Sequence, residues 1–383
     1  MKVGLLGFGV VGSGVGKIVD SPITKSTEGL EIARILVKNE SDLVDSRMTL
    51  HIEDIVNDPS IDVVCECIGG LEPAATYVKQ AIEHGKHVVT SNKKMLATYA
   101  SELFALAKEH HVQIKYEASC GGGIPWIHEI EHVKRIDEIQ SYKGIFNGTS
   151  NYILSRMNAE GKTFDAMLEE AQALGYAERN PSDDIDGFDV RYKVALSCMS
   201  CFDLFVDPSQ IPTYGIRYIS QEDMDFCKEN GYVCKLIGQG IKEENNVFLA
   251  VYPTFLKKES ILACIPLNFN GIEYETTTLG KAMFIGQGAG SLPTAHAVVQ
   301  DLIDLNESVS KEEKESTSGS LSASSKEGIY YIRTKKLALL TPELIERRVG
   351  NDSVLTKEVS FMELNMAIQS IDDESVFVAE VEQ

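Results

Sequence analysis

The sequence predicts an α/β fold of more than one domain, and three observations lead to that prediction. The chain opens with a short apolar strand, "KVGLL", which runs directly into the glycine-rich turn "GFGVVG". Further apolar strands that end in glycines or polar turns, such as "IDVVCECIGG", alternate with helical patterns over residues 1–118. A Ser-, Glu- and Lys-rich stretch at 307–328 then separates a short tail from the rest of the chain.

Composition limits the class of protein. The 383 residues suffice for two or three domains with cores of their own. With 57 Asp and Glu against 36 Lys and Arg, the net charge of -21 argues against nucleic acid or anionic membranes as partners. No run of about 18 apolar residues predicts a membrane span, and the glycine-broken start does not resemble a signal peptide. Eight cysteines without a disulfide-like framework indicate the reducing cytoplasm.

The glycine-rich turn predicts a dinucleotide site. In this fingerprint the first glycine makes a tight turn, the second lets the backbone approach a pyrophosphate, and the third allows close packing of helix and strand. The free N–H groups of the following helix N-terminus then bind the phosphates. The predicted cofactor-binding residues of the turn are Gly7, Phe8, Gly9, Val10, Val11 and Gly12.

The end of the second strand bears on the choice of cofactor. In dinucleotide-binding domains an acid at this place accepts hydrogen bonds from the ribose of NAD, whereas a basic residue accommodates the phosphate of NADP. The strand "EIARILVKN" closes on Lys38 and Asn39 and has no acid there. The sequence therefore leans toward NADP, with NAD or tolerance of both left open.

The later strands predict the rest of a ligand-binding edge, because open α/β sheets bind ligands beyond the carboxyl ends of their strands. "IDVVCECIGG" ends at Gly69 and Gly70, and the next strand runs into "TSNKK", which contains Ser91 and Lys93. We expect Gly69, Ser91 and Lys93 to meet the cofactor or the substrate. A further strand ends at Glu117, before a glycine-rich turn.

An acidic loop between two helices is the candidate centre of the chemistry. Helical spacing predicts a helix in "TFDAMLEEAQALG", with Thr163 as N-cap and Gly175 as the stop. The loop that follows is rich in carboxylates, and its Asp186 is expected to cap the helix in "GFDVRYKVALSCMSCFDLF". On that helix Asp189 and Lys193 stand four residues apart on one face. The helix is so apolar that the pair should be partly buried, which is costly unless function retains it.

Two motifs are better explained by structure than by chemistry. "HEIEH" places His128 and His132 at the spacing of a zinc protease, but no third ligand motif follows, so a solvated helix face is expected. Cys198 and Cys201 form a CxxC inside a helix rather than at its N-terminus, which predicts buried packing.

Six motifs together resemble the homoserine dehydrogenase family over residues 1–306. They are "LLGFGVVGSG", "TSNKK", "YEASCGGGIP", "GIFNGTSNYIL", "LGYAERNPSDDIDGFDVRYK" and "GQGAGSLPTAHAVVQDL". The resemblance implies reversible hydride transfer between a nicotinamide cofactor and L-aspartate 4-semialdehyde, giving L-homoserine for threonine, methionine and isoleucine biosynthesis. Two rivals are a Rossmann reductase of another amino-aldehyde and a non-catalytic NADP-binding redox sensor.

The resemblance also implies roles for the acidic loop and its helix. The family's lysine acid/base matches Lys193, and its substrate-orienting aspartate matches Asp189. Glu178 matches the glutamate that holds the substrate's amino group, with Gly175 lining the same pocket and Asp184 supporting it. Carboxylates suit the substrate's ammonium, and lysines suit its carboxylate and the oxygen that becomes negative. Burial lowers the pKa of a lysine whereas a nearby carboxylate raises it, so the spacing of such a pair matters.

Further implied sites lie near the cofactor. Lys93 matches a family lysine beside nicotinamide and substrate and is the alternative proton donor, with Lys193 favoured. Gly290 matches a glycine whose loop closes on the cofactor. A structural sodium ion is implied, with ligands from the Glu117 carboxylate and the backbone carbonyls of Cys120, Gly122 and Ile124.

The implied organisation has three parts. Residues 1–118 form the Rossmann domain, to which 285–306 return, and 119–284 form an α+β substrate and dimerisation domain. After the linker at 307–328, residues 329–383 resemble a shortened ACT-like α+β module, read as strand, helix, strand, helix, strand. Its ligand turn is not evident, so amino-acid feedback and a purely structural role both remain open. A homodimer or higher homo-oligomer is expected.

Overall fold

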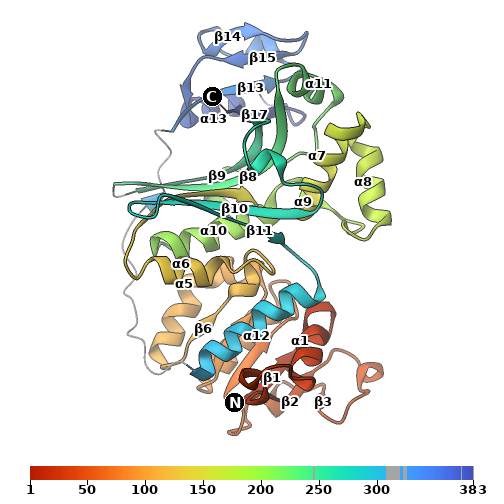
Figure 1. Ribbon diagram of the computed structural model, residues 1–383, viewed down its shortest axis with the longest axis vertical. Helices are drawn as coiled ribbons and strands as arrows, with labels where there is room; N and C mark the ends of the chain where they lie inside the picture. Colours follow the sequence, from red (N-terminus) through yellow and green to blue (C-terminus); the bar gives the residue numbers. More distant parts are fainter. Residues whose placement is uncertain (245, 308–319, 322–325, 372, 383) are drawn as a thin grey trace. The chain divides into compact units, whose positions relative to one another are not determined.

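A computed structural model describes residues 1–244, 246–307, 320–321, 326–371 and 373–382 (Figure 1). Most of the predicted linker, 307–328, lies outside these residues. The chain divides into two compact units, Met1–Arg135 with Gly286–Thr317, and Ile136–Ile285 with Ser318–Gln383.

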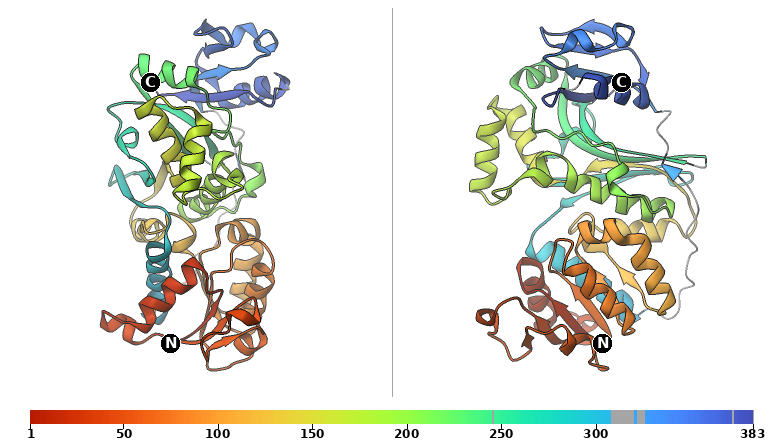
Figure 2. Two further views of the ribbon diagram at one scale, coloured as in Figure 1. Left: turned by 90° about the vertical axis from the view of Figure 1, so that its right-hand side faces the viewer. Right: turned by 180° about the vertical axis from the view of Figure 1, so that it is seen from behind.

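The first unit is built on a parallel sheet in the order β3-β2-β1-β4-β5-β6. Its strands are β1 (Lys2–Leu6), β2 (Glu31–Leu36), β3 (Met48–Thr49), β4 (Val63–Glu66), β5 (His87–Thr90) and β6 (Ile114–Lys115). Its helices are α1 (Val10–Asp20), α2 (Lys25–Glu28), α3 (Glu53–Val56), α4 (Ala74–Glu83), α5 (Lys93–Glu109), α6 (Trp126–Val133) and α12 (Ser291–Glu307). Figure 2 shows α1 and α12 on one face of the sheet and α4 and α5 on the other. This order is that of a dinucleotide-binding Rossmann domain, as predicted.

Helix α12 belongs to the first unit although it follows the second in sequence. Its Val298 and Leu302 are fully buried in one cluster with Val3 and Leu5 of β1. The approach to α1 is close, because a Cβ added at Gly14 would lie 2.8 Å from the Ala295 Cβ. The segment predicted to return to this domain therefore does so through direct helix packing.

The first unit extends further along the chain than the predicted boundary at residue 118. Helix α6 stays with it, because the buried carboxylate of Glu117 accepts hydrogen bonds from the N–H groups of Ile127 and His128 at the start of that helix. A buried carboxylate at a helix N-terminus satisfies backbone donors that would otherwise be unpaired. The boundary falls after Arg135 instead.

The second unit is built on a mixed sheet in the order β11-β10-β7-β8-β9-β17-β13-β15-β14. Its strands are β7 (Ile139–Ile145), β8 (Tyr232–Glu243), β9 (Asn246–Lys257), β10 (Phe269–Thr276), β11 (Lys281–Gln287), β12 (Ser320–Leu321), β13 (Glu327–Arg333), β14 (Ile345–Arg348), β15 (Ser353–Thr356), β16 (Val359–Ser360) and β17 (Phe377–Val381). Its helices are α7 (Gly148–Glu160), α8 (Phe164–Ala173), α9 (Ser182–Ile185), α10 (Phe188–Phe202), α11 (Gln221–Glu229) and α13 (Phe361–Ile371).

Glycine on the central strand lets α10 pack directly on the sheet. A Cβ added at Gly238 of β8 would lie 2.6 Å from Val194 and 2.7 Å from Val190, both on α10. Only glycine at this position allows so close an approach. The helix that carries the predicted catalytic pair is thereby fixed on a rigid support.

The C-terminal tail, which the sequence predicted as a small α+β module, belongs to the second compact unit. Its strand β17 pairs in parallel with β9, so the tail continues the sheet of the second unit. Phe248 and Tyr252 of β9 share one buried cluster with Phe361 and other tail residues, which explains why the tail does not form a unit of its own.

One tail element was also predicted wrongly. The segment after Thr341 was expected to be a helix, but Pro342–Leu344 is a short 3-10 turn and Ile345–Arg348 is strand β14, paired with β15. Pairing with a neighbouring strand overrides the weak helical pattern of so short a segment.

The structure also bears on the CxxC motif and on the predicted lack of a membrane span. Cys198 and Cys201 are buried in α10, as expected for packing residues. Within the described ranges, none of the helices is both long enough and apolar enough to cross a membrane.

Candidate active site

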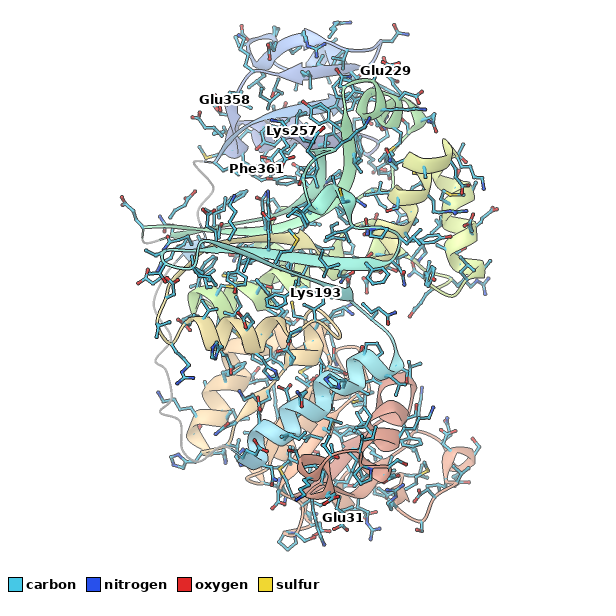
Figure 3. The ribbon with its side chains drawn as sticks, in the orientation of Figure 1. Glu31, Lys193, Glu229, Lys257, Glu358 and Phe361 are labelled. Carbon is cyan, nitrogen blue, oxygen red and sulfur yellow. The ribbon has the colours of Figure 1, made fainter. Side chains whose placement is uncertain are left out.

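The predicted pair on α10, whose Lys193 is labelled in Figure 3, forms a buried ion pair. Lys193 Nζ lies 2.8 Å from Asp189 Oδ2, and the two residues are only 7% and 5% exposed. Lys193 Nζ also donates to the carbonyl of Phe146, 2.6 Å away at the end of β7. The predicted pairing and burial are confirmed, and the sequence did not reveal the carbonyl that holds the ammonium.

Asn147 connects this pair to the acidic loop, and sequence reasoning gave it no role. Its Nδ2 donates to Asp189 Oδ2 at 2.9 Å and to Asp184 Oδ1 at 2.6 Å. Its Oδ1 caps helix α7 by accepting the N–H of Ser150 at 2.7 Å. An asparagine directly before a helical segment is an N-cap signal, which was present in "FNGTSNYIL".

Asp186 is not the predicted cap of α10. The helix begins after Gly187, which adopts a left-handed conformation with φ +82° and has no side chain to cap with. Asp186 instead ends α9 and pairs with the guanidinium of Arg217, with Nη2 to Oδ2 at 2.5 Å. The sharp turn at Gly187 points the carboxylate away from the helix N-terminus.

Two other predicted substrate residues lie in an exposed loop. Gly175 and Glu178 are both exposed between α8 and α9, so the structure does not bury them with the ion pair. The loop is anchored to α7 where Thr149 Oγ1 donates to the carbonyl of Tyr176 at 2.6 Å. Thr163 caps α8 as predicted, by accepting the N–H of Ala166.

In the first unit the glycine-rich turn has the shape of a phosphate cradle. Gly7 has φ +91° and a Cβ there would lie 3.0 Å from the carbonyl of Cys67, while a Cβ at Gly12 would lie 2.0 Å from the Gly7 carbonyl. Open space surrounds Gly9, which directly precedes α1. The turn therefore fits a dinucleotide pyrophosphate, with Phe8, Val10 and Val11 completing the segment.

A second contact supports the start of α1. Ser291 Oγ donates to the carbonyl of Val10 at 2.6 Å, and Gly290 next to it has φ +131°. The predicted cofactor residue Gly290 thus lies in a turn that is attached to the cradle.

The remaining predicted cofactor residues follow the carboxyl ends of the strands, as expected. Lys38 is exposed after β2, Gly69 follows β4 with φ +79°, and Ser91 and Lys93 lie at the junction of β5 and α5.

A buried carboxylate that the sequence analysis missed organises this edge. Glu66, the last residue of β4, is fully buried and accepts hydrogen bonds from four donors. They are the N–H groups of Ile68 and Gly69, the Thr90 hydroxyl at 2.6 Å and the Asn92 amide. Burial raises the pKa of Glu66, and the four hydrogen bonds oppose that shift. Glu66 thereby holds the glycine loop and the Lys93 junction together.

The predicted sodium ligands lie around Glu117. Its carboxylate accepts the N–H of Ile127 at 3.2 Å and of His128 at 2.6 Å, and the Ile124 carbonyl accepts the N–H of Trp126. Cys120, Gly122 and Ile124 are buried in the adjoining turn. A carboxylate offers about four acceptor positions and a carbonyl two, so these oxygens keep capacity for a hard cation.

Titratable groups surround this turn. Burial raises the pKa of Glu117 to about 7. Burial opposes the charge of His128, but its hydrogen bond to Asp301 at 2.9 Å and the nearby carboxylates prevail and raise its pKa to about 9. His128 is therefore not on a solvated helix face as predicted, whereas His132 is exposed.

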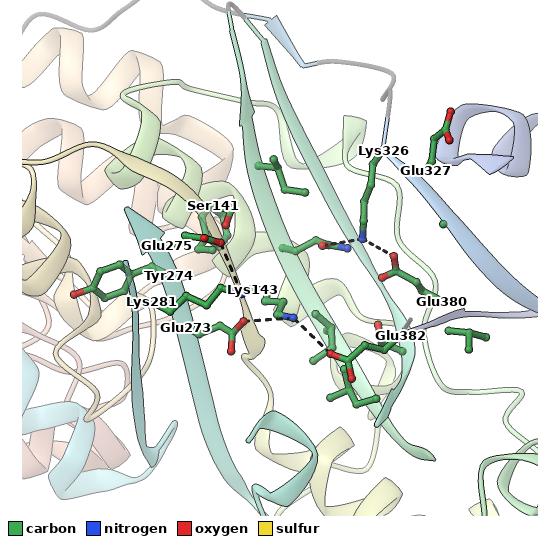
Figure 4. A pocket seen from close by; sticks show the side chains of 18 of the residues that line it. Ser141, Lys143, Glu273, Tyr274, Glu275, Lys281, Lys326, Glu327, Glu380 and Glu382 are labelled. Atoms are coloured by element: carbon green, nitrogen blue, oxygen red, sulfur yellow. Dashed lines mark hydrogen bonds and ion pairs between the residues drawn. The ribbon is translucent and has the colours of Figure 1, made fainter. Parts of the chain in front are cut away.

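A separate cavity of about 390 Å³ lies on the face of the second unit's sheet opposite α10 (Figure 4). Lys143 projects into it, 3.4 Å from Glu273 and 3.9 Å from Glu382. Of the described residues that line it, none belongs to the predicted catalytic, substrate or cofactor set.

Comparison with known proteins places this geometry in a family. A family model for homoserine dehydrogenase matches residues 125–303, and one for the homoserine dehydrogenase NAD binding domain matches residues 7–117. The homoserine dehydrogenase of Bacillus subtilis is 40% identical over 312 residues, which cover 79% of this chain and 72% of the relative. The chain belongs to the homoserine dehydrogenase family. The resemblance, the oxidoreductase class and the NAD(P)-binding domain predicted from the sequence are confirmed.

Solved homoserine dehydrogenase structures have the same fold as this chain. That of Thiobacillus denitrificans has a TM-score of 0.88 and 33% identity, and the match covers 100% of this chain and 98% of that one. A hyperthermophilic archaeal homoserine dehydrogenase in complex with NADPH has a TM-score of 0.69 at 26% identity, covering 80% of this chain and 97% of that one. The predicted α/β class is confirmed, while the ACT-like character of the tail stays a prediction.

The Glu66 network yields a first test. We expect Glu66→Gln to weaken cofactor binding at least about fivefold and to destabilise the first unit by roughly 1–3 kcal/mol, because a glutamine amide turns one acceptor into a donor facing buried donors. Calorimetric cofactor titration and thermal melts measure both effects. Glu31→Gln, an exposed change on β2, is the matched control. Unaltered cofactor affinity in Glu66→Gln would contradict this role.

Proposed function

We propose that this homoserine dehydrogenase interconverts L-aspartate 4-semialdehyde and L-homoserine, with Lys193 as the group that exchanges the proton. The observation that carries the proposal is the buried Asp189–Lys193 pair, which Phe146 and Asn147 hold in place. Burying two charges carries a large desolvation penalty, and a role in catalysis explains why the protein keeps them.

The chemistry requires one hydride and one proton. A bound nicotinamide cofactor would supply the hydride to the aldehyde carbon in reduction and would take it from the alcohol carbon in oxidation. During reduction the carbonyl oxygen gains the electron pair of the C=O π bond, and Lys193 donates a proton to it to give the alcohol. During oxidation the neutral amine of Lys193 takes the hydroxyl proton back.

The other polar groups are proposed to orient the substrate and the Lys193 side chain and not to transfer the proton. Asp189 holds the Lys193 side chain and is proposed to orient the substrate, and Asp184 is linked to Asp189 through Asn147. Glu178, on its exposed loop, is proposed to hold the substrate's ammonium, with Gly175 allowing the turn. Lys93 is proposed to lie near nicotinamide and substrate, and it is the alternative proton donor.

NADP is the proposed preferred cofactor, with NAD as the alternative. Support comes from the end of β2, where Lys38 and Asn39 stand in place of the acid that usually reads the NAD ribose. The archaeal relative in complex with NADPH points the same way.

Removing the charged pair tests the catalytic proposal. We expect the double variant Lys193→Met/Asp189→Asn to lose at least about 100-fold in kcat while it keeps its fold, because it leaves no unpaired buried charge. Initial rates with homoserine, its shorter and longer amino-alcohol homologues, and each cofactor give kcat/KM for every pair. Homoserine with NADP should give the highest value.

Lys242→Ala, which removes an exposed lysine of β8, is the control and should keep parental rates. Near-parental turnover in the folded double variant would falsify the role of Lys193. A homologue that is preferred over homoserine would favour the rival amino-aldehyde reductase. Cofactor binding without any turnover in the parent would favour a redox sensor.

We infer that a structural sodium ion binds at Glu117 and the carbonyls of Cys120, Gly122 and Ile124. Oxygen donors on one buried turn support this, and the raised pKa of Glu117 gives the site a pH dependence. Because the folded state keeps this carboxyl protonated up to about pH 7, its contribution makes stability fall as pH rises from about 4.5 to 7. A cation that binds the ionised form should offset that loss.

Sodium should therefore raise the melting temperature more at pH 8 than at pH 6, relative to choline chloride at equal ionic strength. The difference should vanish in Glu117→Gln and persist in Glu131→Gln, which changes an exposed carboxylate of α6. Equal stabilisation by both salts at both pH values would count against the site.

A homodimer formed through the sheet face with the Lys143 cavity is also proposed. Lys143, Glu273 and Glu382 place both signs of charge on this face, which suits self-complementary pairing across a twofold axis. Light scattering should give about twice the chain mass of 42.2 kDa. Lys143→Glu should shift the protein toward monomer because it gathers like charges, and Lys228→Glu on α11 should not. A monomeric parent at micromolar concentration would refute the proposal.

For the tail, the continuous β9–β17 pairing supports a structural role over amino-acid feedback. The eight cysteines of this large chain support a reducing compartment, and the cytoplasmic location stays a prediction.

A further inference from the structure

Asn270 on β10 is a buried amide with no protein partner. The residue is 0% exposed, and neither its Nδ2 nor its Oδ1 finds a hydrogen-bond partner among the described residues. Leaving such a group unsatisfied costs roughly 1–3 kcal/mol, and buried polar groups in native proteins are almost always paired with protein or ordered water. A leucine would fill similar space without that cost, so we expect the Asn270 amide to have a hydrogen-bond partner outside the protein chain.

The sheet register places Asn270 beside the catalytic pair. In the antiparallel β10–β7 pairing Gly271 faces Ile145 and Ile272 faces Gly144, which puts Asn270 opposite Phe146. Directly opposed residues share one face of a sheet, with Cβ atoms about 5 Å apart. The Phe146 carbonyl is the acceptor that holds Lys193 Nζ at 2.6 Å.

The face is the one that α10 covers. A Cβ added at Gly238 would lie 3.2 Å from the Phe146 ring and within 2.7 Å of Val190 and Val194 of α10. Gly271, the next residue of β10, faces the other way, because a Cβ there would meet Ile265 at 2.0 Å. Alternation along the strand therefore directs the Asn270 amide to the side of the Asp189–Lys193 pair.

The carbonyl of the preceding residue, Phe269, already accepts a hydrogen bond from Asn151 Nδ2 at 2.9 Å. A buried water makes about three hydrogen bonds to groups that are otherwise unsatisfied, and an amide offers both donors and an acceptor to it.

We propose that Asn270 holds a buried water molecule beside the Asp189–Lys193 pair and is thereby a positioning residue for Lys193. This rests on the role proposed for Lys193 above. The water solvates the ammonium and restrains its position against the Phe146 carbonyl. The charged groups next to this end of β10 include Asp189 and Lys193 of α10 and Asp184 of α9, whereas Lys235 of β8 lies on the other face, where it donates to the Ile265 carbonyl.

Two substitutions at this position should act in opposite directions. Asn270→Leu removes both amide groups at similar volume, so we expect an unchanged or higher melting temperature. Its kcat should fall at least about tenfold, with KM within about twofold. The midpoint of its pH–rate profile should move to lower pH, because loss of the water disfavours the charged amine. Asn270→Asp adds a carboxylate that favours the charged amine, so its midpoint should move to higher pH.

Ile272→Val is the matched control, because it changes packing on the same face two residues away without altering a polar group. Its pH midpoint should equal that of the parent. A crystal structure of the unaltered protein should contain a water bonded to the Asn270 amide, and that water should be missing in Asn270→Leu.

The proposal is overturned if both Asn270 variants keep the parental pH profile, or if the crystal shows the amide bonded only to protein groups. Failure of the catalytic proposal is distinguishable. In that case the Lys193→Met/Asp189→Asn variant keeps its turnover, whatever is found at Asn270.

Discussion

The structure of the second unit depends on keeping one ammonium and one carboxylate out of water. The two side chains belong to residues that are only 7% and 5% exposed, and hydrogen bonds to each other and to two further residues compensate for their burial. Asp189 accepts hydrogen bonds from Lys193 and Asn147, and Lys193 also donates a hydrogen bond to the Phe146 carbonyl. Lys193 Nζ and Asp189 Oδ2 lie 2.8 Å apart, so each charge offsets part of the cost of burying the other.

The fold fixes the geometry of that pair through elements far apart in sequence. Gly238 of β8 lets α10 lie close on the sheet, β7 delivers the Phe146 carbonyl, and the N-cap of α7 supplies Asn147. In the first unit Glu66 has a similar structural role at the carboxyl edge of the sheet. Its hydrogen bonds connect the loop after β4 with the junction that carries Lys93. In both units a buried polar side chain at or just after the end of a strand holds the loops for which we propose ligand binding.

Much of this was predictable from local patterns, and the rest depended on tertiary contacts. The glycine spacing at Gly7 and Gly12 and the four-residue spacing of Asp189 and Lys193 are short-range signals, so both were predicted. Asp186 was predicted as a cap because the sequence does not reveal that Gly187 turns the chain and Arg217 captures the carboxylate. The pairing of β17 with β9 was not predicted, because it joins residues more than a hundred positions apart. Asn270 carried no signal at all, since only the register with β7 gives it significance.

Chemical rescue of the proton transfer tests the central claim most directly. In Lys193→Ala, small alkylamines added to the assay should restore homoserine oxidation in a saturable way. The restored rate should rise with the basicity of the amine, because the amine then takes the substrate proton in place of the missing side chain. If amines restored no activity, or restored it without regard to basicity in a protein that is still folded, Lys193 would not be the residue that exchanges the proton.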